Sequence, residues 1–434
     1  MTCISQKLKI LFVVLSIIPL SIRAQFFNEA MSGEALRPFR DVYGINSSTF
    51  SLHNNSLLSR DISSTLENPA FLVNIRRPKA CVSMQYLNVD QRSALADNQQ
   101  EFSTTANTVR ADYFGFAYPV PVYRGNMVFA LSYTPSAYYY SSLQSKGTVT
   151  YDFGDVYQEV NIEETGSLNT LRIAGAIEFL PNFNTGISLN FHGGDRSYQS
   201  VETAIDENDV LINDKIINRE IIKPNYNGFN MDVGLSYHSS NFKFGLKMST
   251  PLNLTIQEVS EFSEILTYDN APDSTQNDYY DFEYESRYPM EIAPSFAAKF
   301  GQLTVGLDII IHNWQKIEVD RLENKSAINR DLYWNLRKTT DIGVFLAMPI
   351  GNAVSTRLAY RRIPSPYENI QNNDDRCCHL YGAGIETILK KTFIIGCAYQ
   401  RAVGDQTITH PYFDTWSSQK YTEDRLTVSM AVLF

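Results

Sequence analysis

The last ten residues of the chain, RLTVSMAVLF, alternate between two kinds of side chain. One set is apolar and runs to the C-terminal residue: Leu426, Val428, Met430, Val432 and Phe434. The intervening set, from Arg425 to Leu433, is smaller or more polar. Successive side chains of a β-strand point to opposite faces, whereas a helix repeats every 3.6 residues. The pattern therefore predicts a strand with one face in an apolar medium and the other in a polar one.

The same period of two recurs upstream and predicts fourteen strands. We expect them near 80–90, 109–119, 126–140, 157–180, 184–198, 226–238, 241–258, 284–299, 302–319, 333–348, 353–362, 379–389, 392–401 and 421–434. Single-chain bacterial outer-membrane barrels have an even number of strands. An aromatic residue that closes an alternating C-terminal strand is typical of their insertion signal, a role we assign to Phe434. The sequence thus predicts an all-β, transmembrane antiparallel barrel with about fourteen strands.

Very short links alternate with long polar stretches between these strands. Pro181–Phe183, Ser239–Asn241 and Gly351–Asn352 are short links, whereas the long stretches are 199–225, 258–285, 320–332, 363–377 and 402–420. Outer-membrane barrels have tight periplasmic turns and long extracellular loops. We therefore expect the long stretches to be solvated loops outside the cell, and the region 140–165 to contain either a break or an extra pair of strands.

The N-terminus carries the pattern of a secretory signal peptide. Lys7 and Lys9 precede an apolar run from Ile10 to Leu20, and Ala24 supplies a small residue at the expected cleavage site. This run is too short to cross a bilayer. We predict a signal peptide over 1–24, a hatch or plug over 25–79, where the strand pattern is missing, and the barrel over 80–434.

Composition excludes several classes of function. The net charge of -10 argues against a nucleic-acid partner, which requires clustered Lys and Arg. No run of about eighteen apolar residues follows residue 25, and the mean hydropathy is -0.23. Alternating barrel strands average to such a value, and the 26 Tyr and 25 Phe suit aromatic girdles.

No motif in the sequence points to catalysis or to a cofactor. The chain lacks G-x-S-x-G, H-E-x-x-H and a P-loop. Cys377 and Cys378 precede His379, but neighbouring side chains on a strand point to opposite faces and chelate poorly together. We therefore expect no enzyme activity, no metal and no cofactor.

Several short elements together resemble the FadL/TodX family of outer-membrane transporters for fatty acids and aromatic hydrocarbons. Glu67-Asn68-Pro69-Ala70 is similar to the Asn-Pro-Ala element of that family's N-terminal hatch, and Arg77-Pro78 then leads into the first strand. Tyr288-Pro289, a turn at Gly301 and Trp314 follow in the family's order, as do Arg357–Tyr360 before Pro364-Ser365-Pro366. Asn46–Arg60 departs from the family, because it is rich in Ser and Asn where the family commonly has Gly and acidic residues.

The resemblance implies passive uptake of a hydrophobic small molecule, of the long-chain fatty acid or aromatic hydrocarbon class, through a lumenal pocket and a hatch. Asn68, Pro69 and Ala70 would form the hatch, or else an ordinary turn before the first strand. Phe26 and Phe27 would fill a pocket, or belong to an unanchored terminus. Gly193 and Gly194 would mark a strand kink, since Gly weakens strand pairing, or the point where a strand runs into an external loop.

A second reading assigns a different function to the same fold. PorV-like subunits of the type IX secretion machinery share this barrel but dock secreted proteins, so secretion-system proteins are alternative partners. A transporter requires a continuous apolar pocket, whereas a docking subunit requires a broad extracellular surface. Under either reading we expect the chain to contact outer-membrane lipid and, during insertion, the barrel-assembly machinery.

Overall fold

The fold is described from a computed structural model over residues 25–28, 62–95, 100–151, 154–207, 213–268, 272–351, 353–368, 377–410 and 415–434. The predicted signal peptide and the stretch Asn46–Arg60 lie outside these residues.

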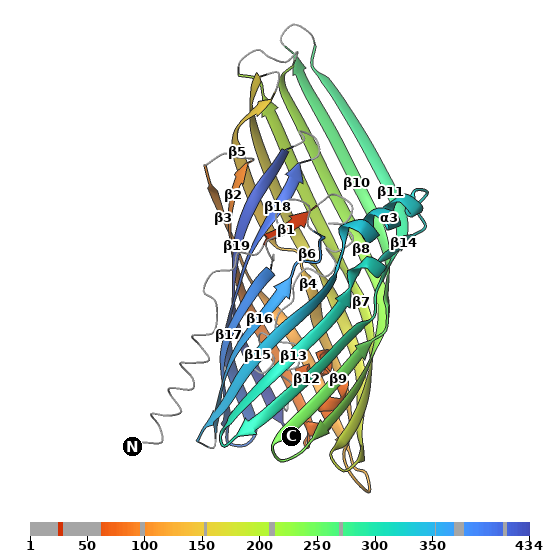
Figure 1. Ribbon diagram of the computed structural model, residues 1–434, viewed down its shortest axis with the longest axis vertical. Helices are drawn as coiled ribbons and strands as arrows, with labels where there is room; N and C mark the ends of the chain where they lie inside the picture. Colours follow the sequence, from red (N-terminus) through yellow and green to blue (C-terminus); the bar gives the residue numbers. More distant parts are fainter. Residues whose placement is uncertain are drawn as a thin grey trace.

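Fourteen antiparallel strands form a closed barrel, as the alternation predicts (Figure 1). In order around the wall they are β2 (Lys79–Leu95), β3 (Phe102–Val120), β4 (Met127–Tyr138), β6 (Gly154–Leu180), β7 (Phe183–Ile205), β8 (Asn213–His238), β9 (Phe242–Ser249), β12 (Glu291–Phe300), β13 (Leu303–Asn313), β15 (Lys338–Ile350), β16 (Val354–Pro364), β17 (Cys377–Leu389), β18 (Phe393–His410) and β19 (Thr415–Leu433). β19 pairs with β2 from Ser417↔Leu95 to Leu433↔Lys79, which closes the ring. Tight turns such as Gly301-Gln302 mark the periplasmic end, where the C-terminus lies.

The outer surface has the apolar belt of a protein that spans the outer membrane. Exposed apolar side chains recur at every second position along the wall, for example Phe183, Ile187 and Phe191 of β7. Exposed aromatic side chains form part of this belt, among them Tyr86, Tyr381 and Tyr399. In the described chain, no helix is long and apolar enough to span a membrane.

The extracellular side is built of strands rather than loops, which corrects the prediction for three long stretches. The stretch 199–225 belongs largely to β7 and β8, and 402–420 to β18 and β19. The stretch 258–285 forms a hairpin of β10 (Leu252–Tyr268) and β11 (Ser274–Tyr288). β5 (Ser141–Tyr151) pairs with β6, so the alternative of an extra pair within 140–165 is confirmed.

Two predicted strands are interrupted at prolines. The strands expected at 241–258 and 284–299 each divide, into β9 and β10 at Pro251 and into β11 and β12 at Pro289. Proline has no N–H to donate to a ladder, so pairing breaks there. These prolines therefore lie at the level where the membrane-spanning wall ends and the extracellular strands begin.

A short helix covers the lumen from the extracellular side. β13 ends in a 3-10 turn, η5 (Trp314–Lys316), and is followed by β14 (Glu318–Asp320) and α3 (Lys325–Asn335). The strands predicted at 302–319 and 333–348 were therefore too long at these ends. Asn329 of α3 exchanges two hydrogen bonds, of 2.7 and 2.9 Å, with the backbone of Val319. We call β5, β10, β11, β14 and α3 the extracellular crown.

Residues 62–74, which precede the first wall strand, lie inside the barrel. Two 3-10 helices, η3 (Ile62–Leu66) and η4 (Pro69–Asn74), are almost entirely buried and pack against β4, β6, β7 and β8 near the periplasmic end. We call residues 62–74 the plug. β1 (Gln25–Asn28) pairs in parallel with Asp405–Ile408 of β18, beyond the point at which β17 stops pairing with that strand.

Removing the C-terminal aromatic ring should impair assembly. Phe434 is 64% exposed at the periplasmic rim, and its N–H donates to the carbonyl of Pro78 across the closing seam. In the variant Phe434→Ala the backbone bond can still form, but the exposed ring is lost. We expect the amount of folded barrel in the membrane to fall to roughly half or less, measured by heat-modifiable migration in gels. An equally exposed wall residue, Phe300→Ala, serves as the control, and a normal yield of Phe434→Ala would contradict the assignment.

Candidate functional site

The plug is held to the barrel wall by Asn68. Its side-chain Oδ1 accepts a hydrogen bond from the N–H of Ala70 at 3.0 Å, which caps the start of η4. Its Nδ2 donates to the carbonyl of Leu235 in β8 at 3.1 Å. Pro69 occupies the first helical position, where a missing N–H costs nothing. The Asn68-Pro69-Ala70 element is thus a helix cap that is also bonded to the wall.

Three glycines on neighbouring strands form the surface on which this element rests. A Cβ at Gly186 of β7 would lie 2.5 Å from the carbonyl carbon of Pro69, and one at Gly234 of β8 would lie 2.0 Å from the Asn68 Oδ1 atom. A Cβ at Gly245 of β9 would lie 2.6 Å from the ring of Phe71. Any larger residue would push the plug away from the wall. We call Gly186, Gly234 and Gly245 the glycine cradle.

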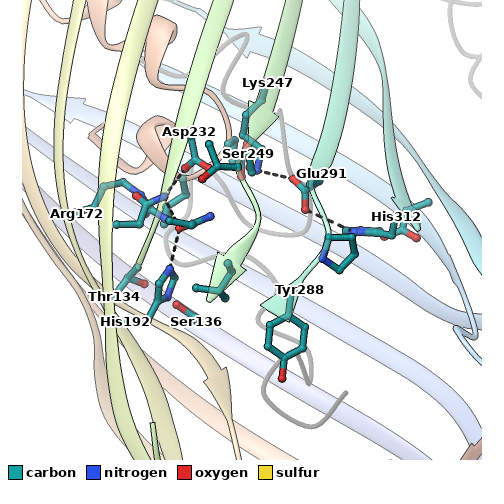
Figure 2. Close-up of a pocket in the computed structure, with 18 of the residues that line it drawn as sticks. Thr134, Ser136, Arg172, His192, Asp232, Lys247, Ser249, Tyr288, Glu291 and His312 are labelled. Carbon is teal, nitrogen blue, oxygen red and sulfur yellow. Dashed lines mark hydrogen bonds and ion pairs between the residues drawn. The ribbon is translucent and has the colours of Figure 1, made fainter. Parts of the chain in front are cut away.

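A cavity of about 300 Å³ lies in the lumen above the plug. Leu66 and Glu67 of the plug contribute to it, and the remaining lining comes from wall strands on several sides. Figure 2 shows Arg172 and Asp232 on one side of this cavity, Glu291 and His312 on the other, and Tyr288 at a distance from the charged groups. The cavity therefore brings together residues that are far apart in the sequence.

Charged side chains in ion pairs form one part of the lining. Lys247 of β9 pairs with Glu291 of β12, with 2.6 Å between Nζ and Oε1. Arg361 of β16 pairs with Asp341 of β15 at 2.5 Å. His312 of β13 lies between the two pairs, 3.8 Å from each carboxylate. We call these five residues, with Arg172 and Asp232, the polar belt.

Arg172 of β6 lies at the opposite end of the polar belt. Its Nε donates to Asn190 at 2.7 Å, and Asn190 donates in turn to Asp232 at 2.8 Å. The Nη1 atom of Arg172 is buried and makes no hydrogen bond within the part of the chain that the structure describes. His192 continues the network through Asn230, with 2.9 Å between Nε2 and Oδ1. A buried guanidinium donor without an acceptor is costly, so this group is suited to a ligand.

The other part of the lining is apolar and belongs to the crown. Leu252 and Tyr288 line the cavity and also belong to a buried cluster with Ile328 and Leu332 of α3. Trp314 packs against the same cluster, stacks on His312 at 4.7 Å between ring centroids, and donates to Thr339 at 2.9 Å. The cavity is therefore mixed rather than apolar throughout, so a molecule that fills it needs a polar group beside its apolar part.

The cavity also reaches an irregular part of the wall. Thr134, Pro135 and Ser136 of β4 line it, and the register of β4 against β6 shifts between Pro135 and Ala137. β3 pairs with β4 only from Phe114↔Tyr133 to Val120↔Met127. Beyond Tyr133 these two strands exchange no ladder pairs within the described residues, and side chains bridge them instead: the hydroxyls of Thr134 and Tyr138 donate to the backbone carbonyl and the carboxylate of Asp112.

The glycines singled out in the sequence lie within β7, next to a gap in its ladder with β8 between Asp195↔Asn225 and Tyr198↔Ile222. β7 runs through Gly193 and Gly194, and Gly193 pairs with Asn169 on one side and Asn227 on the other. The irregularities around the cavity are at Pro135 and at the prolines that separate β9 from β10 and β11 from β12. Phe26 and Phe27 lie in β1, where their backbones pair with Gln406 and Thr407 of β18. Their role in filling a pocket stays a prediction.

The cysteines that invite a metal reading are in the wall. Cys377 and Cys378 are buried, and His379 shares a 2.8 Å hydrogen bond with the hydroxyl of Tyr360. Within the described ranges no group of three or more His, Cys, Asp or Glu residues is arranged to hold a metal ion.

The polar belt was not predicted from the sequence, although a signal for it exists. Asp232, Lys247 and Asp341 each occupy the inward set of an alternating strand. A charge at such a position within a membrane-spanning strand must face the lumen, where it needs a partner. The glycine cradle had the same kind of signal, since Gly186, Gly234 and Gly245 are inward positions with no side chain.

A protein-family model matches this chain over most of the barrel. The match is to BamG and covers residues 44–363, which is more than half of the chain. The chain belongs to the BamG family. A search of curated proteins gives no match.

Several solved structures have a fold similar to that of this BamG-family barrel. A Pseudomonas aeruginosa FadL homologue superimposes with a TM-score of 0.60 at 12% identity, covering 92% of this chain and 100% of its own. The Pseudomonas putida toluene transporter TodX gives 0.54 at 12% identity, covering 91% and 100%. The Ralstonia pickettii toluene transporter TbuX gives 0.51 at 11% identity, covering 86% and 94%. The predicted resemblance to the FadL/TodX barrel is thereby confirmed as a likeness of fold.

Proposed function

We propose that this BamG-family barrel is an outer-membrane channel for passive uptake of hydrophobic small molecules that carry a polar end, such as long-chain fatty acids. The observation that carries the proposal is the mixed lining of the cavity. Leu252, Tyr288 and Trp314 lie in its apolar part, and the polar belt supplies the charged groups. The solved relatives of the same fold include transporters of toluene, which supports hydrophobic cargo in general.

The lining favours fatty acids over aromatic hydrocarbons. An apolar tail gains free energy by leaving water for the apolar part, at about 25 cal/mol per Å² of buried area. A plain hydrocarbon that filled the whole cavity would strip water from the polar belt without replacing its hydrogen bonds. A carboxylate or hydroxyl end can restore them, and the unpaired Nη1 of Arg172 is a donor for such a group.

The proposed exit is through the wall beside β4. The plug blocks the periplasmic end below the cavity, and it is bonded to the wall through Asn68. Thr134, Pro135 and Ser136 line the cavity where β3 and β4 no longer pair. An apolar molecule that leaves here enters lipid directly and avoids crossing water. Under this proposal Asn68, Pro69 and Ala70 keep the hatch in place, and cargo leaves sideways.

A series of ligands with the same tail tests the proposal. Dodecane, dodecanol, dodecanoate and dodecyltrimethylammonium, together with toluene, would be titrated into the detergent-purified barrel and followed by tryptophan fluorescence. We expect dodecanol and dodecanoate to bind at least about tenfold more tightly than dodecane, toluene and dodecyltrimethylammonium. Only the first two ligands can accept a hydrogen bond from Arg172, and one hydrogen bond to a charged group contributes about 1.5–3 kcal/mol.

Two variants test whether the ligands bind in the cavity. Leu252→Asp puts a charge in the apolar part and should weaken every ligand with a dodecyl tail, whereas Leu307→Asp alters a lipid-facing side chain and should leave binding unchanged. Tightest binding of dodecane would refute the polar-end requirement. Absence of binding by the whole series would refute transport and favour the second predicted function, docking of secreted proteins, for which the extracellular crown supplies a broad surface.

A further inference from the structure

The outer part of β11 has an edge that no other strand covers. On one side β11 pairs with β10 along its whole length, from Ser274↔Leu266 to Tyr288↔Leu252. On the other side β11 pairs only with β14, through Glu285, Ser286 and Arg287. From Ser274 to Tyr284 no strand of the described chain pairs with this second edge. Figure 1 shows β11 in the highest part of the crown, with β14 and α3 near its base.

Both faces of this part of β11 are also open to solvent. From Ser274 to Glu283 every residue is exposed except Asp278, which is half-buried. Tyr279 is 64% and Tyr280 is 55% exposed, and these neighbours point to opposite faces. An extended segment lying along the edge would find unpaired backbone groups, with an aromatic side chain on each face.

The hairpin carries most of the net charge of the protein. Between Leu252 and Tyr288 there are nine acidic residues and one basic residue, so its net charge is -8 against -10 for the whole chain. Only some of these acidic residues form ion pairs with residues outside the hairpin. Lys223 pairs with Glu261, and Arg321 pairs with Glu283 and Glu285. Asp278 and Asp281 on the open stretch have no ion pair among the residues described.

We propose that this edge of β11 binds an extended, basic segment of a partner protein, which adds to the crown as a further strand. Main-chain hydrogen bonds supply the affinity in strand addition, and side chains at alternate positions supply the specificity. The charge selects the partner, because two acidic edges of this chain repel each other whereas a Lys-rich strand is attracted. Binding of a partner at this edge does not depend on transport, because the edge lies outside the cavity.

A designed peptide tests the edge directly. A labelled peptide of about twelve alternating Lys and Val residues is long enough to cover the open stretch, and its binding to the detergent-purified full chain would be measured by fluorescence anisotropy. We expect binding that weakens at least about tenfold for a Glu–Val peptide of equal length. A Lys–Val peptide with proline at alternate positions keeps its charge but cannot pair, and we expect a similar loss.

Variants of the hairpin separate pairing from simple charge attraction. Neighbouring N–H groups in an antiparallel strand point to opposite edges, so Asn277→Pro and Asp278→Pro block different edges. The variant that blocks the open edge should abolish peptide binding while hydrogen exchange in β10 stays slow, which shows an intact hairpin. Asp278→Asn with Asp281→Asn should weaken binding several-fold without loosening the hairpin.

Three results would overturn the proposal. The first is binding of the proline-containing Lys–Val peptide as tightly as its parent, which would show attraction without strand pairing. The second is wild-type binding by both single-proline variants with an intact hairpin. The third is concentration-dependent dimerisation of the chain alone that the open-edge proline variant abolishes, which would make a second copy the occupant.

Discussion

Replacing Gly186 with alanine is expected to open the barrel to ions. The new Cβ would lie 2.5 Å from the carbonyl carbon of Pro69 and 2.6 Å from the nitrogen of Ala70. Both neighbours are backbone atoms, which cannot rotate away as a flexible side chain could. The plug must therefore move off the glycine cradle, and the Asn68 bond to Leu235 is lost with it. A barrel almost as wide as the 16-stranded porins leaves an aqueous channel once its interior is freed, so we expect conductance in planar bilayers to rise roughly tenfold.

The same strand provides a matched control. Gly193 is also in β7, and a Cβ there would meet nothing closer than a carbonyl oxygen at 3.8 Å. Gly193→Ala should therefore conduct like the wild type. Heat-modifiable migration of both variants verifies that the barrel itself has folded. Equal conductance of Gly186→Ala and Gly193→Ala would mean that the plug does not seal the lumen.

Removing the charge of Lys247 is expected to be strongly destabilising. Lys247 and Glu291 form an ion pair of 2.6 Å inside the lumen, with side-chain exposures of 7% and 19%. In Lys247→Met the carboxylate of Glu291 stays in place but loses this partner. Breaking a buried pair on one side costs about 3–5 kcal/mol, and we expect a loss near the lower limit because Glu291 retains some water. Urea unfolding in detergent micelles measures the difference in free energy.

The paired substitution distinguishes charge from packing. If the loss arises from an uncompensated charge, adding Glu291→Leu to Lys247→Met should recover most of the stability. If it arises from a cavity where the lysine chain was, the double variant should be less stable than either single one. A loss of unfolding free energy below about 1 kcal/mol in the single variant would mean that solvent screens this ion pair as it screens surface pairs. That result would contradict the expectation of an uncompensated buried charge.

The sequence predicts the membrane-spanning wall well because lipid imposes a pattern there. Along β7 and β8 the apolar set from Phe183 to Phe191 and from Phe229 to Tyr237 stops at the edge of the bilayer. Beyond it both faces of a strand meet water or protein, so no alternation of apolar and polar residues is required. The stretches 199–225 and 258–285 therefore look like loops, although backbone pairing carries the same strands far outside the membrane.

The candidate site is less visible in the sequence for a different reason. Asn68-Pro69-Ala70 has a local signal, because a cap and a proline at the first helical position are encoded by neighbouring residues. The polar belt has no local signal of partnership: Lys247 and Glu291 come from different strands, and only the register brings them together. Charged residues at inward positions can be found by counting faces, but which of them pair depends on the closed barrel.

The closing seam keeps the plug on a short tether. Only Ile75–Pro78 separates the plug from β2, the strand that completes the ring by pairing with β19. Asn126 contacts the plug's end as well, donating to the carbonyls of Val73 and Ile75 at 2.7 and 2.8 Å. Four residues span at most about 14 Å when fully extended. A plug that comes off the glycine cradle therefore stays close to the periplasmic start of β2 and can return to the same wall.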